Sequence, residues 1–318
     1  MLKLYVGFML AAMIAASLPP LSIAKTNQVQ NKSVAERLGY AADAKLLIVH
    51  ADDLGMAHSI NNATIKAFAT GLVNSASIMI PCSWVPEIAD YARANPRADL
   101  GLHLTLTSEW KNYRWGPVLP RDRVASLLDD KGYFYLTESV AASHAKVDEA
   151  EREIRAQIDL ARKLGIQPTH LDSHMGTLYQ NKELFETLIR VGRDNKLPVR
   201  VYRDQIRRLP YLTSLLKPED ILVDHMISIV PSVTPEGWAK FYTDEVKNLR
   251  PGLSEIIVHI AHDDAEMKAM TADHPDWGAA WRQRDFEFFT SEAFREMLKT
   301  HNIKLVTWRE IRKLQYGE

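Results

Sequence analysis

The amino-acid sequence predicts an α/β fold: a (β/α) barrel of the TIM type, either regular or distorted, with as few as seven strands. Short apolar segments rich in β-branched residues alternate along the chain with amphipathic segments, which is the pattern of βα units around a mostly parallel sheet. No low-complexity linker divides these units. An open, doubly wound sheet is the alternative, and in both arrangements functional groups lie at the carboxyl ends of strands.

The predicted strands are short, mostly apolar runs. The first contains the apolar run Leu46–Val49, the third alternates leucines with His103, and the seventh begins just before Ile256-Ile257-Val258. Period-2 alternation or a continuous apolar run of this length is typical of a half-buried or fully buried strand. In chain order the strands are expected at residues 46–51, 74–80, 99–105, 169–173, 198–201, 220–224, 255–260 and 304–307.

The predicted helices are the amphipathic segments between these runs. Ser59 and Ser291 are suitable N-caps, because a serine hydroxyl can accept a hydrogen bond from a free backbone N–H group. Gly71 and Gly165 are suitable helix ends. The helices are expected at residues 59–70, 85–94, 139–164, 182–194, 235–248, 291–300 and 308–315.

The first 24 residues have the pattern of a secretory signal peptide. Lys3 precedes an apolar run over residues 4–18, and small residues end the segment at Ala24. The run is shorter than the ~20 residues that a transmembrane helix needs, although a retained anchor is the alternative. We therefore expect cleavage, export to the periplasm or the medium, and one domain over residues 25–318.

The composition narrows the partners and the chemistry. With 39 basic and 40 acidic residues, the chain has no charge excess that would attract nucleic acid or an anionic membrane. A neutral substrate fits this balance, and a homodimer is compatible with it. The single cysteine, Cys82, excludes an intramolecular disulfide and a thiolate metal cluster, so any metal must be held by histidine and carboxylate.

Asp52 and Asp53 follow the first predicted strand, where functional groups are expected. A buried carboxylate is costly unless it is paired or binds a metal. The alternative is that one acid caps the next helix and the other faces water.

Histidines follow the third and fourth predicted strands in the same way. His103 lies on the face opposite its leucine neighbours, although a histidine there can also be a hydrogen-bonded core residue. His170 and His174 in an extended segment would stand about 13 Å apart, at ~3.3 Å per residue, so one ion cannot bind both directly. His174, nearer the carboxyl end, is the better ligand candidate, while His170 and Asp172 are candidates for a supporting or lining role.

The seventh predicted strand ends in His259 and His262, which are candidate acid/base groups because imidazole can exchange a proton near neutral pH. Four separate strands thus deliver Asp or His at the same kind of end. One carboxylate and two imidazoles from three strands would form a metal site with open positions, which is typical of a hydrolase rather than of a closed structural site.

These motifs resemble the YdjC-like carbohydrate deacetylases, the group that includes chitooligosaccharide deacetylase and hopanoid-biosynthesis deacetylase relatives. The resemblance covers residues 46 to about 307 and rests on five ordered motifs: Ala-Asp-Asp-Leu-Gly at 51–55, Gly-Leu-His-Leu-Thr-Leu-Thr at 101–107, Pro-Thr-His-Leu-Asp-Ser-His at 168–174, Val-Arg-Val-Tyr-Arg at 199–203 and Val-His-Ile-Ala-His-Asp-Asp at 258–264. It implies a barrel-like (β/α) fold, one divalent metal ion, usually magnesium, and removal of an acetyl group from an N-acetylated sugar.

The resemblance also implies roles for particular residues. Asp53, His103 and His174 would bind the metal, Asp52 would be the general base and His259 the general acid. Arg200 and Arg203 would line the substrate pocket, with His170 and Asp172 beside them. The donor set itself suits zinc, manganese or nickel better than magnesium, which prefers oxygen ligands.

The chain departs from the family pattern at three places. Met175 and Gly176 follow His174 where relatives often have further histidines, His259 is followed by Ile260-Ala261 instead of Pro-Gly, and Leu54 replaces a phenylalanine. These changes leave the three expected ligands in place and affect the substrate pocket.

Aromatic residues give a further expectation about the pocket. They either stack on sugar rings or anchor loops, and segment 109–120 is the expected lid over the substrate. They occur after the second and third predicted strands and in a late loop, at Trp84, Trp110, Tyr113, Trp115, Trp277 and Trp281.

Three other functions are the alternatives. A metal-dependent phosphoesterase would usually need more bridging carboxylates, and a glycosidase would need two opposed carboxyl groups across the scissile bond. A noncatalytic glycan-binding barrel would bind sugar without releasing acetate.

Overall fold

The computed structural model describes residues 32–317. The predicted signal peptide lies outside these described residues, and its cleavage and the export of the chain stay predictions. Within residues 32–317, no helix has both the length and the apolar character needed to cross a bilayer.

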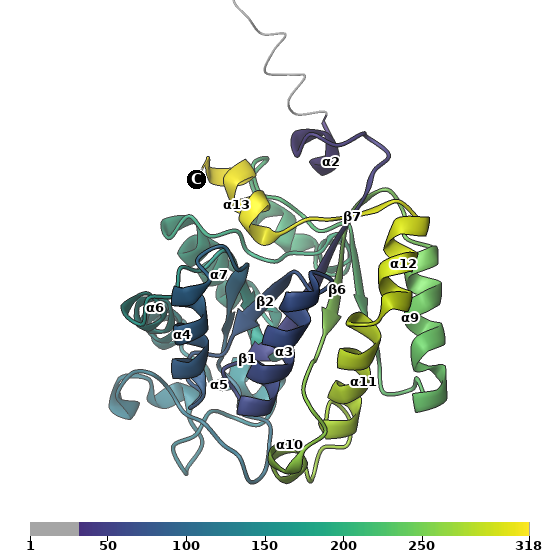
Figure 1. The fold of residues 1–318 in the computed structure, drawn as a ribbon. Coiled ribbons are helices and arrows are strands. Elements are labelled where there is room, and N and C mark those ends of the chain that lie inside the picture. Colours follow the sequence, from purple (N-terminus) through teal and green to yellow (C-terminus); the bar gives the residue numbers. More distant parts are fainter. Residues whose placement is uncertain (1–31, 318) are drawn as a thin grey trace, which may run out of the picture. The chain divides into compact units, whose positions relative to one another are not determined.

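Seven parallel strands form one curled sheet (Figure 1). Six follow the order β4-β3-β2-β1-β6-β5, and β7 pairs with the first residues of β1. The predicted α/β class with a parallel sheet is thereby confirmed. The strands are β1 (Lys45–Leu54), β2 (Ser75–Ile78), β3 (Leu100–Leu104), β4 (Leu171–Ser173), β5 (His225–Ser228), β6 (Gly252–Val258) and β7 (Ile303–Leu305).

Helices connect the strands and cover the outer face of the sheet (Figure 1). The α-helices are α2 (Val34–Arg37), α3 (His58–Thr70), α4 (Val85–Ala94), α5 (Glu138–His144), α6 (Val147–Lys163), α7 (Lys182–Asp194), α8 (Arg203–Arg208), α9 (Trp238–Lys247), α10 (Ala265–Met270), α11 (Ala279–Phe289), α12 (Glu292–Thr300) and α13 (Trp308–Tyr316). Short 3₁₀ helices are η1 (Arg121–Arg123), η2 (Ala125–Leu127), η3 (His174–Tyr179), η4 (Pro210–Leu215) and η5 (Pro235–Gly237).

Two predicted strands are wrong, and a complete TIM barrel is not confirmed within residues 32–317. The segment predicted as strand 198–201 forms only the isolated bridges Leu171–Val199 and, just beyond it, Tyr202–Val223. Pro198 has no N–H group to donate, which limits the pairing of this segment. The strand predicted at 220–224 begins instead at residue 225 as β5.

The helix predicted over residues 139–164 is divided in two. Ala145 and Lys146 have extended backbone angles between α5 and α6. The Lys146 N–H group donates to Ser126 Oγ at 2.9 Å, a tertiary contact that replaces a helical hydrogen bond. The local sequence could not show this break, because its cause lies 20 residues away along the chain.

Three helix-end predictions are confirmed and one is wrong. Gly165, just after the C-cap of α6, has a left-handed φ of 86°. Ser291 accepts a hydrogen bond from the Phe294 N–H group as the N-cap of α12. Gly71, at the end of α3, has a left-handed φ of 70°. Ser59 lies inside α3, which begins one residue earlier and is preceded by Ala57.

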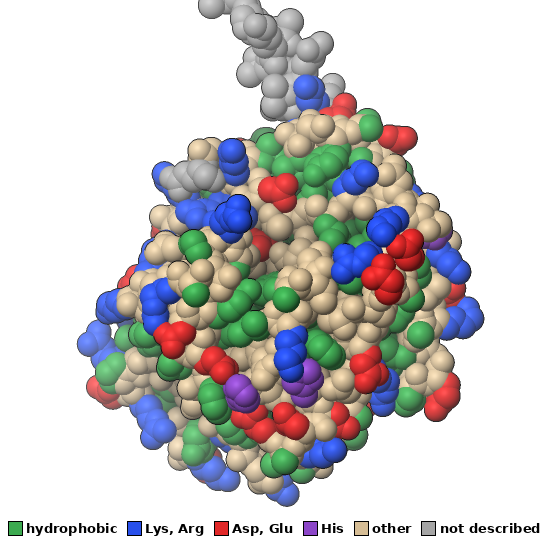
Figure 2. Space-filling view, in the orientation of Figure 1, with side chains coloured by type: hydrophobic (Ala, Val, Ile, Leu, Met, Phe, Trp, Pro, Cys, Tyr) green, Lys and Arg blue, Asp and Glu red, His purple; other side chains and the backbone are tan. Residues whose placement is uncertain are grey.

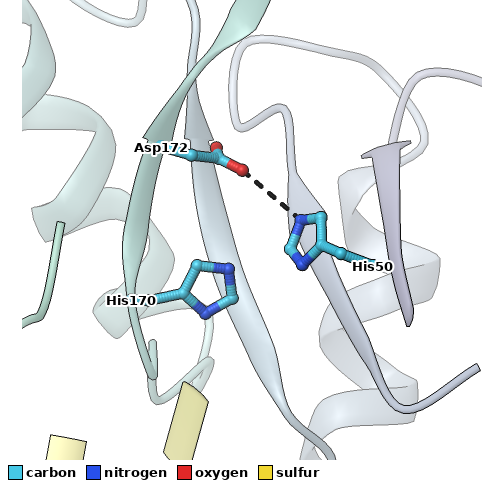
Figure 3. A group of neighbouring side chains, drawn as sticks. All are labelled: His50, His170 and Asp172. Atoms are coloured by element: carbon cyan, nitrogen blue, oxygen red, sulfur yellow. Dashed lines mark ion pairs between the residues drawn. The ribbon is translucent and has the colours of Figure 1, made fainter. Parts of the chain in front are cut away.

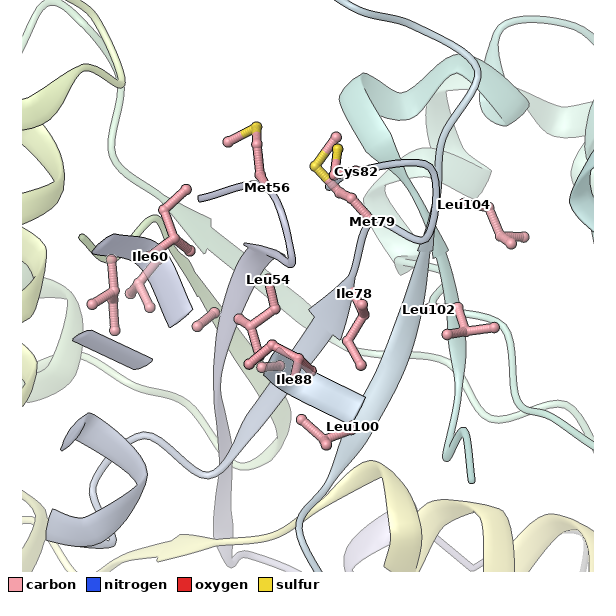
Figure 4. Close-up of a cluster of buried hydrophobic side chains, with 14 of the residues drawn as sticks. Leu54, Met56, Ile60, Ile78, Met79, Cys82, Ile88, Leu100, Leu102 and Leu104 are labelled. Atoms are coloured by element: carbon pink, nitrogen blue, oxygen red, sulfur yellow. The ribbon is translucent and has the colours of Figure 1, made fainter. Parts of the chain in front are cut away.

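The two faces of β1 belong to different packed clusters. Leu47, Val49 and Ala51 pack under the helices in the main core, part of which is drawn in Figure 4. Leu46 and Ile48 face the inside of the curled sheet, in a cluster with Trp308. The inner face therefore begins apolar and, by the strand period of two, continues to positions 50 and 52.

On the face shown in Figure 2, basic and acidic side chains are interspersed. Over the whole sequence the formal net charge is −1 at pH 7.

Candidate active site

A bulge near the end of β1 brings two neighbouring acids into one site. Ala51 pairs with Ala76 and Leu54 pairs with Ile78, so three residue steps on β1 match two on β2. Asp53 takes a left-handed φ of 74° within this bulge. As a result Asp52 and Asp53 both reach His103, while Leu54 returns to the outer core (Figure 4).

The structure brings together the three residues predicted to bind a metal. Asp53 Oδ1 lies 3.5 Å from His103 Nε2 and 3.6 Å from His174 Nδ1. Ligand atoms of the three residues all lie within 4.8 Å of one another, and the three side chains are buried. They come from β1, β3 and the first residue of η3, directly after β4.

One oxygen of Asp53 has no hydrogen-bond donor. Asp53 is 2% exposed, its Oδ2 accepts from Arg282 Nη2 at 2.8 Å, and its Oδ1 has no hydrogen-bond partner among the described residues. A buried carboxylate oxygen left in this state is costly. A cation between Asp53, His103 and His174 would satisfy it, so these residues fit a divalent metal ion.

Carboxylates hold the far side of both histidine rings. His103 Nδ1 contacts Asp172 Oδ1 at 2.7 Å, and His174 Nε2 contacts Glu109 Oε2 at 3.0 Å. These contacts leave His103 Nε2 and His174 Nδ1 for Asp53 and an ion, as is usual for histidine ligands. Sequence reasoning missed Glu109; its position soon after the third strand was the available signal.

The acidic side chains of the site favour a positive charge between them. Burial would lower the pKa of His174, but Glu109 and Asp53 outweigh burial and raise that pKa to about 10. Burial would raise the pKa of Asp53, yet Arg282 and the neighbouring imidazoles hold it well below its usual range.

Asp52 lies beside this trio and is held by two cationic side chains. Arg200 Nη1 and Nη2 lie 3.1 and 3.4 Å from the two oxygens of Asp52, and His50 Nε2 lies 3.1 Å from Oδ1. Burial would raise the pKa of Asp52, but Arg200, His103 and His50 lower it well below its usual range. Asp52 is therefore ionised at neutral pH.

His259 lines the same cavity, but in a different state from the one expected. Burial lowers the pKa of His259 to about 4, although Asp53 opposes this effect. The ring is therefore neutral at rest, whereas the sequence-based mechanism assumed a protonated ring. His262 lies apart from this cavity, where its Nε2 is 3.2 Å from Lys66 Nζ.

Three predicted substrate-binding residues are not in the cavity wall formed by the described residues. Asp172 is fully buried and contacts Arg200 and His103, so it supports other site residues. His170 is fully buried and stacks on Trp308. Arg203 is half exposed and pairs with Asp224. Arg200 does line the cavity.

His50, His170 and Asp172 form a second buried group that could hold a cation (Figure 3). His50 Nε2 lies 3.4 Å from Asp172 Oδ2, but Arg200 Nη1 already contacts the same oxygen at 2.9 Å. Burial opposes protonation of His50, yet Asp172 and Asp52 raise its pKa to about 9. Because the Arg200 guanidinium already pairs with the carboxylate that an ion would need, we interpret this group as a polar network beneath the site.

A cavity of about 450 Å³ opens above these residues. Two of the predicted aromatic residues, Trp110 and Trp277, line it, while Trp115 and Trp281 are buried anchors. Its wall consists of Asp52, Asp53, His103, Glu109, Trp110, Glu138, Ser173, His174, Met175, Gly176, Tyr179, Arg200, Tyr202, Gln205, Met226, Ser228, Ile257, His259, His274, Asp276, Trp277 and Arg282.

Sequence reasoning missed Arg282 because it missed α11. That region was expected to be a loop, whereas Arg282 lies on a helix, 2% exposed, with its guanidinium 5.8 Å from the Trp110 ring centre. Asp285, one turn further on, accepts from the His259 N–H group at 3.0 Å and from Trp238 Nε1 at 2.9 Å. α11 thus supports both Asp53 and the backbone of His259.

Comparison with known proteins gives one family. Residues 46–300 match the model of the YdjC-like protein family. A carbohydrate deacetylase of Thermus thermophilus is 32% identical over 287 residues, covering 87% of this chain and 97% of the relative. A carbohydrate deacetylase of Enterococcus faecalis is 27% identical, covering 84% and 98%.

Solved structures point to the same fold. A protein of Enterococcus faecalis named for cellobiose-phosphate cleavage superposes with a TM-score of 0.71 at 27% identity, covering 84% of this chain and 99% of that one.

A further relative was found by sequence. A chitooligosaccharide deacetylase of Yersinia enterocolitica is 30% identical over 52% of this chain and 62% of the relative.

Proposed function

This chain belongs to the YdjC-like protein family, and we propose that it is a metal-dependent hydrolase that removes an acetyl group from an N-acetylated sugar or oligosaccharide. The relatives named carbohydrate deacetylase support deacetylase activity. The observation that carries the proposal is the convergence of Asp53, His103 and His174, with one unpartnered oxygen of Asp53 between them. Export of the mature chain is part of the proposal and rests on the leader pattern.

Asp53, His103 and His174 would hold the metal ion. When bound, such an ion supplies Lewis-acid polarisation of the acetyl carbonyl and acidifies water. The resemblance implies Mg²⁺, whereas two imidazoles and one carboxylate are donors better suited to Zn²⁺ or Mn²⁺. Metal analysis of the purified chain distinguishes these ions.

Asp52 is the general base of the proposed mechanism. It is ionised, it is 5% exposed, and Arg200 and His50 fix its orientation. It can accept a proton from the water molecule that attacks the acetyl carbon. Positioned acid/base groups of this kind typically contribute ~10²–10⁴-fold to the rate.

His259 completes the reaction at the nitrogen atom. Its ring is neutral at rest, so the proton that Asp52 removes from the attacking water would pass to His259, which then donates it to the departing amine. The C–N bond then breaks, and acetate and a free amino sugar are the products. The indole rings of Trp110 and Trp277 in the cavity wall offer apolar faces for a sugar ring.

The test is acetate release from N-acetylglucosamine oligomers by the metal-stripped and the metal-restored chain. The proposal predicts release only after a divalent ion is restored. Sugar binding without acetate release would contradict the proposal and indicate a noncatalytic glycan-binding protein. Release by the stripped chain at the full rate would contradict the metal dependence.

A further inference from the structure

Both guanidinium groups of the cavity wall pair with carboxylates, and only Arg200 Nε and Arg282 Nη1 have no hydrogen-bond partner among the described residues. Arg200 is 4% exposed and contacts Asp52 at 3.1 Å and Asp172 at 2.9 Å. Arg282 is 2% exposed, contacts Asp53 at 2.8 Å and donates from Nε to the Trp277 carbonyl oxygen at 2.6 Å. No lysine occurs among the described residues that line the cavity.

Two acids of the same wall, unlike the arginines, have no side-chain partner among the described residues. Glu138, the first residue of α5, is half-buried, and Asp276, shortly before α11, is exposed. Neither has a hydrogen-bond or ion-pair partner from its side chain within residues 32–317. Glu109, the third acid outside the catalytic pair, contacts His174. Apart from the proposed metal ion, the unpaired side chains among the acids, arginines and lysines of the described wall are therefore the two acids Glu138 and Asp276.

A second observation, separate from the two acids, points to a ligand in this cavity: the Oδ1 atom of Asp53, which lines it, is buried and has no hydrogen-bond partner among the described residues. A ligand that enters must therefore face both the catalytic residues and the two free acids. Proteins usually recognise phosphate with free arginine or lysine side chains, and a phosphate group carries ~1.5–2 negative charges at neutral pH. Placing it here would bring like charges together, whereas an amine would meet an opposite charge.

Resting on the proposed deacetylase function, we propose that the substrate is an N-acetylated oligosaccharide without phosphate, and that a free amine on a neighbouring sugar strengthens binding at Glu138 and Asp276. The preferred substrate class is then a neutral or partly deacetylated glycan. Hydroxyl groups of a neutral sugar can donate to the same two carboxylates.

The experiment compares four disaccharides with the metal-loaded chain at pH 7 and low salt, where the amine of an amino sugar is largely protonated. They are di-N-acetylchitobiose, its 6-phosphate, and both isomers that carry one amine in place of an acetamide. We expect kcat/KM for the phosphate to be lower than for the neutral sugar by about tenfold or more, because like charges in a cavity repel strongly. We expect a lower KM for the amine isomer that is turned over, with this advantage shrinking as added salt screens the charges.

The paired variant Glu138→Gln/Asp276→Asn tests the residues. In this variant the KM of the amine isomer should no longer be lower than that of the neutral sugar. The gap in kcat/KM between the neutral sugar and its phosphate should become smaller. The matched control is Asp130→Asn/Glu186→Gln, which removes two exposed acids that do not line the cavity and should leave both ratios unchanged.

Two results would overturn the inference. One is a phosphorylated sugar that is turned over as well as the neutral sugar, and the other is an amine preference that persists in the Glu138/Asp276 variant. Acetate release from none of the sugars would overturn the deacetylase function itself and this inference with it.

Discussion

Asp52 and Asp53 are neighbours with different surroundings. Arg200 contacts both oxygens of Asp52, and His50 contacts one of them, so Asp52 has little room to bind an ion. Arg282 occupies only one oxygen of Asp53 and leaves the other between two histidines. This difference supports the roles proposed above, which are proton transfer for Asp52 and metal binding for Asp53.

Replacing Asp52 by asparagine should abolish turnover and leave metal affinity nearly unchanged. We expect a loss of roughly 10²–10⁴-fold in kcat, because the general base is gone while the ligands remain. His174→Ala should lose both turnover and metal binding. Acetate release and calorimetric metal titration measure the two quantities, and equal metal loss in both variants would contradict the assigned roles.

His50 makes the polar network beneath the site dependent on pH. Its pKa is raised to about 9 from 6.5, so the folded chain holds a proton there that the unfolded chain releases earlier. The resulting stability is fully present below pH 6.5 and is lost as pH rises through 9. At ~1.36 kcal/mol per unit, this amounts to about 3 kcal/mol as an upper estimate.

Denaturant unfolding of the metal-free chain between pH 6.5 and 9.5 checks this prediction. The free energy of unfolding should fall with pH more steeply in the wild type than in His50→Gln. The control is His301→Gln, at the end of α12, which should keep the wild-type slope. Equal slopes for wild type and His50→Gln would show that His50 is not charged in the folded chain.

At the scale of elements, the close approach of β3 and β4 depends on a glycine. A Cβ atom at Gly101 would lie 2.3 Å from His170 Nε2, so the imidazole occupies the space that any side chain at position 101 would need. His170 in turn stacks on Trp308 of α13, with ring centres 5.1 Å apart. A histidine that was a candidate for the pocket thus serves the packing between strands and helix.

Gly101→Ala should therefore destabilise the fold by about 1–3 kcal/mol, the usual cost of overpacking a core. Truncating His170 to alanine removes the clash, so Gly101→Ala/His170→Ala should lose less stability than the sum of the single variants. A double-mutant cycle from chemical denaturation measures this coupling. Additive losses would contradict the contact.

At the scale of the whole molecule, a metal ion would join segments that are far apart in sequence. Asp53, His103 and His174 follow or end three different strands, and Arg282 reaches Asp53 from α11. An ion that binds only this folded arrangement must stabilise it by mass action.

A divalent ion at about 100 times its Kd should raise the free energy of unfolding by ~2.7 kcal/mol. Asp53→Asn should lose this increment because it loses a charged ligand, whereas Asp52→Asn should keep it. Thermal or chemical unfolding with and without metal measures the effect. Stabilisation of the Asp53 variant equal to that of the wild type would place the ion elsewhere.

The sequence by itself determined the α/β class, the ends of α4 and α7, and the strand ends that carry candidate ligands, while the family resemblance chose Asp53, His103 and His174 among them. These features depend on local patterns: apolar runs, helix periodicity, and polar residues at strand ends. The order of the motifs along the chain indicated the family, and the match of residues 46–300 to the family model confirms it.

Only the tertiary structure decided the bulge at Asp53, the break between α5 and α6, and the contacts of Glu109, Arg282 and His50. Each depends on a partner distant in the chain, such as Arg282, which lies 229 residues from Asp53. Tertiary contacts also moved His170 and Arg203 out of the predicted pocket. A local pattern reports the preference of a segment, whereas the partner that satisfies a buried charge is chosen by the packing of the whole chain.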